Sequence, residues 1–131
     1  MTNSTTSTQT AWDTETLDKI NRADDLKIAP LRADGKHGTP TWIWEVVVDG
    51  RLYVRAYSGT SSSWYKSAVA HQAGIIQAAG QRFDVKFNPV SDRTLNDKID
   101  AAYHAKYDPS QYVGHMVGAG SRAATVEILP C

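Results

Sequence analysis

The chain has almost no cysteine, no run of basic residues and no long apolar segment. Its one cysteine is the last residue, Cys131, so an internal disulfide is excluded and a nucleophilic role at a chain end is not expected. Fourteen basic and fourteen acidic residues give a formal net charge of zero, which argues against nucleic-acid binding and polybasic membrane binding. The apolar runs are shorter than the roughly 18 to 20 residues of a membrane-spanning helix, and no hydrophobic signal region is visible. We therefore expect a soluble, cytoplasmic protein whose partner is a small molecule.

The length of 131 residues suits one domain and leaves little for a second. Residues 1–11 are polar, small and non-periodic, which predicts a flexible tail before a single domain over residues 12–131. The four histidines lie in different segments with no cysteine near them. We therefore expect no metal site.

A central hairpin is predicted between residues 41 and 57. Residues 41–48 are apolar on both faces except at Glu45, which suits one strand covered on two sides. Asp49-Gly50 is a strong two-residue turn signal, so residues 51–57 should return antiparallel. Alternation then places Tyr53, Arg55 and Tyr57 on one face of the second strand, and Leu52, Val54 and Ala56 on the other.

The remaining pattern predicts helices and strands of ordinary length. Helical spacing behind a capping residue predicts helices over residues 13–24, 64–72 and 91–108. Further strands are expected over residues 26–31, 75–78, 82–87 and 123–129, with an irregular Gly-rich stretch before the last. About six strands, joined mostly as hairpins, with two to three peripheral helices predict an α+β, mainly β fold. A small antiparallel barrel fits best, because closure removes exposed strand edges.

The segment after Arg55 carries the clearest sign of a binding site. Residues 58–63 offer hydroxyls, small side chains and free backbone amides, and the cations Arg55 and Lys66 flank them. Such a loop can hold a phosphate or a carboxylate, but serine-rich stretches also serve as plain connections. Trp64 and Tyr65 stand beside this loop as candidate pocket walls, whereas core packing is the favoured interpretation of Trp42 and Trp44.

Two titratable residues are candidate catalytic groups. Glu45 is a lone carboxylate in an apolar strand, so it must reach solvent, pair with a cation or hold a proton suited to transfer. Pairing, with an arginine as a candidate partner, is the favoured interpretation. His71 falls on the helix that begins near Trp64 and could face the same groove as a proton donor, with an ordinary surface histidine as the alternative.

Several of these motifs resemble a known barrel. In order and spacing, they are similar to the split β-barrel of FMN- and deazaflavin-dependent, nitroreductase-like proteins; the motifs are residues 32–40, Asp49-Gly50, Leu52-Tyr53-Val54, Ser58-Gly59, Trp64-Tyr65 and residues 80–83. The resemblance covers residues 26–89, and residues 122–130 echo the closing strand. Over residues 17–130 the chain is more closely similar to a bacterial and fungal group known only as a domain of unknown function.

The resemblance implies a homodimeric barrel with a groove that holds a flavin or deazaflavin cofactor. Carried over by position, the residues near the cofactor phosphate would be Lys36, Arg55, Ser58, Gly59 and Trp64. Tyr65 and Lys66, which flank the same loop, complete the candidate binding set.

Three functions remain open at this point. The first is a flavin- or deazaflavin-dependent oxidoreductase, in which the cofactor supplies the hydride chemistry. The second is a cofactor-independent isomerase or cyclase, in which aromatic walls shape the substrate and Glu45 or His71 moves a proton. The third is a ligand-binding protein without catalysis. An intact phosphate site favours the first, a closed aromatic cavity that contains a carboxylate or histidine the second, and a filled barrel the third.

Overall fold

A computed structural model describes residues 12–23, 25–32, 34–36, 38, 40–107 and 113–130. The predicted tail and Cys131 lie outside this range. The elements, in chain order, are α1 (Thr14–Ala23), β1 (Lys27–Pro30), β2 (Thr41–Trp42), β3 (Glu45–Val48), β4 (Arg51–Arg55), the 3-10 helix η2 (Gly59–Ser61), α2 (Ser63–His71), β5 (Ala73–Ala78), β6 (Gln81–Pro89), α3 (Arg93–Tyr107), α4 (Val113–Met116), α5 (Ala119–Ala123) and β7 (Thr125–Pro130).

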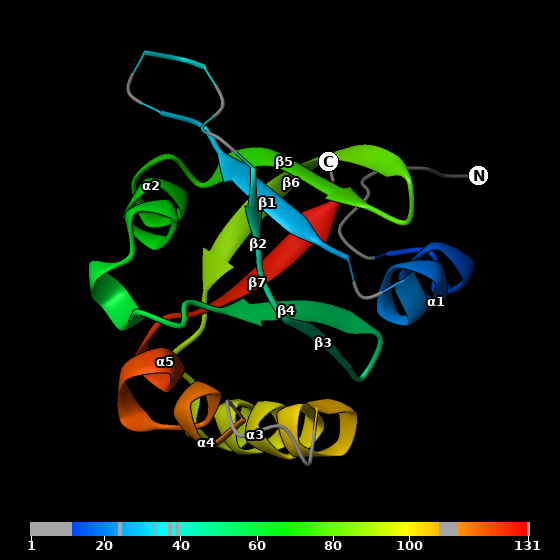
Figure 1. Cartoon of the computed structure of the whole chain (residues 1–131), viewed down its shortest axis with the longest axis vertical. Coiled ribbons are helices and arrows are strands. Elements are labelled where there is room, and N and C mark those ends of the chain that lie inside the picture. Colours follow the sequence, from blue (N-terminus) through cyan, green and yellow to red (C-terminus); the bar gives the residue numbers. More distant parts are fainter. Residues whose placement is uncertain are drawn as a thin grey trace, which may run out of the picture.

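Within the described residues, seven strands form one antiparallel sheet in the order β2-β1-β5-β6-β7-β4-β3. The two edge strands, β2 and β3, are consecutive in the chain and are separated only by Ile43 and Trp44. A link of two residues cannot span a flat sheet of seven strands, because neighbouring strands lie about 4.8 Å apart. The sheet therefore curls until its edges meet at this link, which gives the barrel seen in Figure 1. We call residues 42–44 the seam.

The seam corrects the prediction of about six strands. Residues 41–48 were expected to form one strand, but the chain bends at the seam and the two halves pair with opposite edges. Thr41 and Trp42 pair with β1, and the Ile43 backbone N–H donates to the Leu26 carbonyl at 3.1 Å. Beyond the bend, Glu45 pairs with Val54 on β4. Apolar residues on both sides of the bend conceal it in the sequence.

The predicted central hairpin is confirmed. Val48 pairs with Arg51, so Asp49 and Gly50 alone make the turn, and both have positive φ angles, of 52° and 77°. This is the backbone that Asp-Gly favours between two strands, because it matches their twist.

The two faces of β4 enter two different clusters, as the alternation predicts. Leu52, Val54 and Ala56 are buried inside the barrel with residues from β1, β5 and β7. Tyr53 lies in a second cluster with Ile99 and Tyr103 of α3. Figure 1 shows α3 along the outside of the β3–β4 hairpin, with α4 and α5 at its end and α2 on another side of the barrel.

The helices exceed the predicted two to three, because the described residues contain five α-helices. The three long helices match the predicted ranges within a few residues. The additional helices, α4 and α5, have four and five residues and occupy the Gly-rich stretch that was expected to be irregular. Helices this short show no periodicity in a sequence. No helix in the described part of the chain is long and apolar enough to cross a membrane.

Candidate functional site

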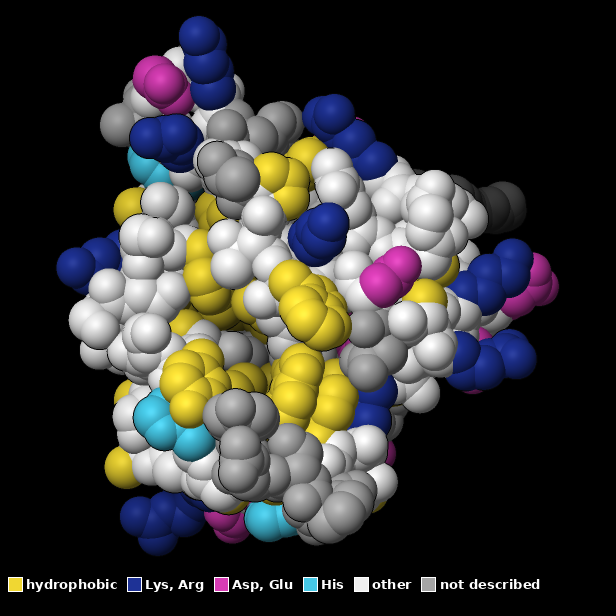
Figure 2. Space-filling model, viewed as in Figure 1, with side chains coloured by type: hydrophobic (Ala, Val, Ile, Leu, Met, Phe, Trp, Pro, Cys, Tyr) yellow, Lys and Arg dark blue, Asp and Glu magenta, His cyan; other side chains and the backbone are white. Residues whose placement is uncertain are grey.

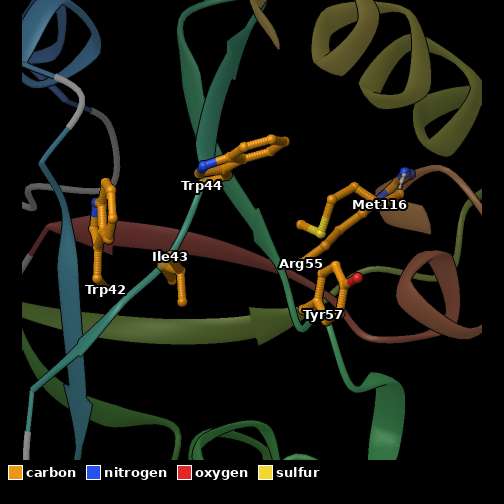
Figure 3. Close-up of a pocket in the computed structure, with 6 residues that line it drawn as sticks. All are labelled: Trp42, Ile43, Trp44, Arg55, Tyr57 and Met116. Atoms are coloured by element: carbon orange, nitrogen blue, oxygen red, sulfur yellow. Dashed lines mark hydrogen bonds between the residues drawn. The ribbon is translucent and has the colours of Figure 1, made fainter. Parts of the chain in front are cut away.

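A pocket opens where the seam meets the end of β4. Its volume is about 410 Å³, and its lining residues are Trp42, Ile43, Trp44, Arg55, Tyr57 and Met116. Figure 3 shows these side chains around one opening, and Figure 2 shows hydrophobic side chains gathered around a hollow on this face. The volume lies within the range of about 300 to 1,000 Å³ that is usual for small-molecule sites. We call this cavity the seam pocket.

Three aromatic rings form the walls of the seam pocket. Trp42 is 65% exposed and Tyr57 is 50% exposed, although large rings normally gain stability from burial. The Trp44 ring stacks on Tyr107 of α3 at a centroid distance of 4.1 Å and an angle of 3°. The Tyr57 ring stacks on His115 of α4 at 3.9 Å. The expectation that Trp42 and Trp44 pack in the core is therefore wrong for Trp42, because the seam turns its ring outward.

Arg55 forms the base of the seam pocket, and its side chain is fully buried. The Nε–H donates to Thr125 Oγ1 at 3.0 Å. Nη1 donates to Asp100 Oδ1 at 2.5 Å and to the Met116 carbonyl at 3.1 Å. Nη2 donates to the carbonyl and to the side-chain oxygen of Asn96, at 3.2 and 3.1 Å. A guanidinium has five N–H donors, and here each donor has an acceptor within the protein.

Asp100 joins this base to a second arginine. Its Oδ2 accepts from Arg122 Nη1 at 2.6 Å, and Arg122 Nη2 donates to Asp97 Oδ1 at 2.8 Å. The hydrogen bond to Asp97, with the charge of Asp100, raises the pKa of Arg122. Two arginines and two aspartates thus form a cluster without net charge, which fixes α3 and the segment before β7 against β4. Asn96 of the same helix is buried.

Tyr103 lies beneath Arg55 and also holds the seam. The Arg55 Cζ is 5.5 Å from the centroid of the Tyr103 ring, a distance that allows a cation–π contact. The Tyr103 hydroxyl donates to the Trp44 carbonyl at 2.9 Å. Burial raises the pKa of this hydroxyl, so Tyr103 stays protonated and remains a donor. Its role is therefore to position Trp44 and Arg55.

The structure separates the residues that were predicted to share one anion site. Trp64 is buried in the cluster inside the barrel, on the opposite face of β4 from Arg55. Lys36 lies on the β1–β2 loop, which projects at the top of Figure 1, whereas β4 lies in the lower half. Lys66 is exposed on α2. Their roles in binding stay predictions, and among these four residues Arg55 alone is a described lining residue of the seam pocket.

The predicted loop at residues 58–63 is compact. Its first turn is the helix η2, where the Ser58 carbonyl accepts from the Ser61 hydroxyl at 2.9 Å. Gly59 is buried with φ of +70°, and a Cβ there would be 3.1 Å from the Gly120 carbonyl oxygen, so glycine is required by both backbone and space. The Tyr65 hydroxyl reaches the Ala123 carbonyl at 3.5 Å. The loop thus packs against α5.

Neither candidate catalytic residue lines the seam pocket. Glu45 is fully buried and accepts from Lys106 Nζ at 2.7 Å. The expectation of a cation partner is confirmed, but the cation is a lysine of α3 and not an arginine. His71 is the last residue of α2 and is exposed. Catalysis by either residue stays a prediction.

Sequence reasoning missed Ile43 and Met116 as pocket residues, and the role of Asp100. Ile43 lies between two tryptophans, and such a Trp-x-Trp signal in a strand could have indicated that both rings share a face. Met116 gave no signal, since it lies on the four-residue helix α4 in the Gly-rich stretch. In the described part of the chain, no three histidine, cysteine or acidic side chains gather in a group that could hold a metal ion.

A family comparison identifies the relatives of the chain. The family model described as "Uncharacterized protein conserved in bacteria (DUF2255)" matches residues 16–128, so the chain belongs to this family. The resemblance to a domain of unknown function is thereby confirmed. No curated protein sequence matches the chain significantly.

Solved structures show the same fold at low sequence identity. The conserved hypothetical protein Rv2991 from Mycobacterium tuberculosis aligns with a TM-score of 0.65 and 12% identity, over 98% of this chain and 85% of that one. A candidate pyridoxamine 5'-phosphate oxidase from Listeria innocua aligns at 0.60 and 10%, over 89% and 90%. A candidate 5-nitroimidazole antibiotic resistance protein from Bacteroides thetaiotaomicron aligns at 0.58 and 13%, over 90% and 79%. The chain therefore has the split β-barrel fold, which by itself does not define a function.

Proposed function

We propose that this member of the DUF2255 family is a small-molecule-binding split-barrel protein whose seam pocket accepts a flat, conjugated ring. The observation that carries the proposal is the pair of exposed rings, Trp42 and Tyr57, at the mouth of an apolar cavity of about 410 Å³. Trp44 and Tyr57 are held in place by stacking on Tyr107 and His115. Fixed aromatic walls favour a planar ligand, because stacking then costs little conformational entropy.

A flavin or a deazaflavin is the candidate ligand that the barrel suggests. Neighbouring structures include a candidate pyridoxamine 5'-phosphate oxidase, and the ring system of a flavin suits the three aromatic walls. Its phosphate has less support at the seam pocket, since Arg55 is the only charged residue among the described residues of the lining and its five donors are occupied. The described lining thus suits the ring, and its guanidinium has no unoccupied donor for a phosphate.

An oxidoreductase activity belongs to the same proposal. When bound, a flavin or deazaflavin would supply the hydride chemistry. The residues of the chain would bind the ring between Trp42 and Tyr57 and exclude water with Ile43 and Met116. A cofactor-independent reaction has less support, since Glu45 and His71 lie outside the pocket lining.

The test is a titration of the purified protein with riboflavin, FMN and a deazaflavin, followed by ligand fluorescence and tryptophan emission. We expect saturable binding at micromolar concentrations to at least one of the three. The variant Trp42→Ala should bind at least tenfold more weakly, which corresponds to about 1.4 kcal/mol. Val69→Ala is the matched control, because Val69 is an exposed apolar residue of α2 that does not line the seam pocket.

Two results would contradict the proposal. One is the absence of binding for all three ring compounds, which would leave the aromatic mouth to another type of partner. The other is binding that Trp42→Ala and Val69→Ala weaken equally, which would place the ligand elsewhere. The predicted homodimer is a separate part of the proposal and is checked by light scattering after gel filtration.

A further inference from the structure

We infer that the Arg55–Asp100 cluster makes the seam pocket selective for uncharged rings, with Asp100 as the residue that determines this specificity. The inference rests on the proposed function, since it concerns which rings the same pocket accepts. It reverses the ordinary expectation for an arginine in a binding site, where the guanidinium recognises a phosphate or a carboxylate.

All hydrogen-bond donors of the Arg55 guanidinium are already occupied. Five acceptors from Thr125, Asp100, Met116 and Asn96 occupy its five N–H donors. A ligand anion could gain a hydrogen bond from Arg55 only by displacing one of these acceptors. The displaced acceptor would then be buried without a partner, which is unfavourable.

A ligand in the seam pocket also has no direct access to the Arg55 guanidinium. The Arg55 side chain is 0% exposed. A ligand in the pocket therefore contacts the apolar side chains of the lining and not the guanidinium itself. Figure 3 shows the Arg55 side chain running from β4 toward the helices, with Met116 and Tyr57 beside it. The Met116 carbonyl accepts a hydrogen bond from Arg55, and the Met116 side chain lines the pocket. Helix α4 is therefore fixed over the Arg55 guanidinium.

The charges around the pocket base also cancel. Asp100 lies 2.5 Å from Arg55 and 2.6 Å from Arg122, and Asp97 completes the cluster. Two positive and two negative groups cancel, so the field at the pocket gives little attraction to an anion. The other described residues of the lining, Trp42, Ile43, Trp44, Tyr57 and Met116, have uncharged side chains.

The experiment compares two ligands with the same ring, riboflavin and FMN, which differ by a phosphate. Affinities are measured with the full chain, at one fixed pH for all variants. We expect wild-type protein to bind riboflavin at least as tightly as FMN. Raising the salt concentration should leave the ratio of the two affinities unchanged, because no ion pair with the phosphate is formed.

Asp100→Asn then tests the cluster directly. The substitution keeps the shape of the side chain and leaves the pocket base with one net positive charge, so FMN should gain about tenfold in affinity relative to riboflavin. Asp97→Asn is the matched control. Asp97 lies on the same helix but contacts Arg122 and not Arg55. Its side chain is 64% exposed, so water screens the charge that its loss leaves behind, and the variant should leave the ratio within about twofold of wild type.

The outcomes separate the inference from the proposed function. If neither ligand binds wild-type protein, the proposed function fails and the inference fails with it. If both bind, but FMN binds about tenfold more tightly and added salt reduces this preference, the proposed ring site stands and the inference is overturned. An unchanged ratio in a folded Asp100→Asn variant also overturns it. If that variant does not fold, the wild-type ratio and its salt dependence decide.

Discussion

The two faces of strand β4 are built on different principles. On one face, Leu52 and Val54 are buried among apolar side chains inside the barrel. On the other, Arg55 is just as buried but lies in a network of hydrogen bonds and charges under α3. Apolar packing is adaptable, since neighbouring side chains can shift to share a change in volume. A buried charge network depends on every partner, because each loss leaves another group unsatisfied.

The pocket in which we propose that a ligand binds lies on the polar face. The seam pocket is lined by Arg55 and Tyr57 from this face, whereas Ile43 is the one described residue of the cluster inside the barrel that lines it. The network therefore has two roles, since it holds α3 and α4 on the sheet and it forms the base of the pocket. The following substitutions test how far the two faces differ in their contribution to the free energy of unfolding.

The largest effect is expected for Arg55→Met. Removing one partner of a buried ion pair typically costs about 3 to 5 kcal/mol, because the other charge remains buried. Asp100, Asn96 and Thr125 would all lose a donor. We expect a loss of this size in the free energy of unfolding, measured by urea denaturation. If Arg55 were instead an exposed residue that binds an anion, the same substitution would leave the free energy of unfolding nearly unchanged.

The double variant Arg55→Met/Asp100→Leu serves as the control for this prediction. Replacement of both charges by apolar side chains is often neutral or stabilising. We expect it to recover most of the loss, while Arg122 retains its ion pair with Asp97. If the double variant is as unstable as the single variant, loss of packing volume rather than the unpaired carboxylate explains the effect.

An intermediate effect is expected on the apolar face for Val54→Ala. Val54 is fully buried, and the substitution removes two methyl groups and leaves a cavity, for a cost of about 2 to 3 kcal/mol. The m-value, which is the slope of the free energy of unfolding against urea concentration, should stay the same, because the surface exposed on unfolding is unchanged. Ligand binding at the seam pocket should also be unaffected. A change in affinity would mean that the two faces are coupled.

Much of this architecture is predictable because it depends on local pattern. The Asp49-Gly50 turn fixes the hairpin, and alternation fixes the faces of β4, since both signals act over a few residues. The seam was not predictable. Its bend at Ile43 and Trp44 exists because two edges of a closed sheet meet there, and no local preference of these residues reports the closure of the sheet.

The base of the seam pocket was unpredictable for a related reason. The partners of Arg55 are separated from it in the sequence by 41 residues for Asn96, 45 for Asp100 and 70 for Thr125. An arginine on a strand beside a serine-rich loop has the same local sequence whether it faces solvent or a buried carboxylate. Only the position of α3 decides between these environments, and that position is set by tertiary packing.

A smaller effect is expected for Tyr103→Phe. The variant loses the hydrogen bond to the Trp44 carbonyl, which costs about 1 kcal/mol. Because burial raises the pKa of Tyr103 in the folded protein, its contribution is complete below its usual pKa near 10 and is lost as the pH rises through the folded pKa. The measurement is an alkaline titration that follows the absorbance of tyrosinate. Tyr103 should be among the last tyrosines to ionise, when the protein unfolds, so this last step should be smaller by one tyrosine in the variant.

The smallest effect is expected for Lys98→Ala, on the same helix as Asp100. Lys98 Nζ lies 3.3 Å from Asp49 Oδ2, and both side chains are more than half exposed. This pair also joins α3 to the β3–β4 hairpin, but water screens it, so its loss should cost at most about 1 kcal/mol. In roughly 1 M salt the cost should vanish, whereas the cost of Arg55→Met should persist. If Lys98→Ala cost as much as Val54→Ala, burial would not be what distinguishes the Lys98–Asp49 pair from the Arg55–Asp100 pair, and the contrast between the two faces of β4 would need another cause.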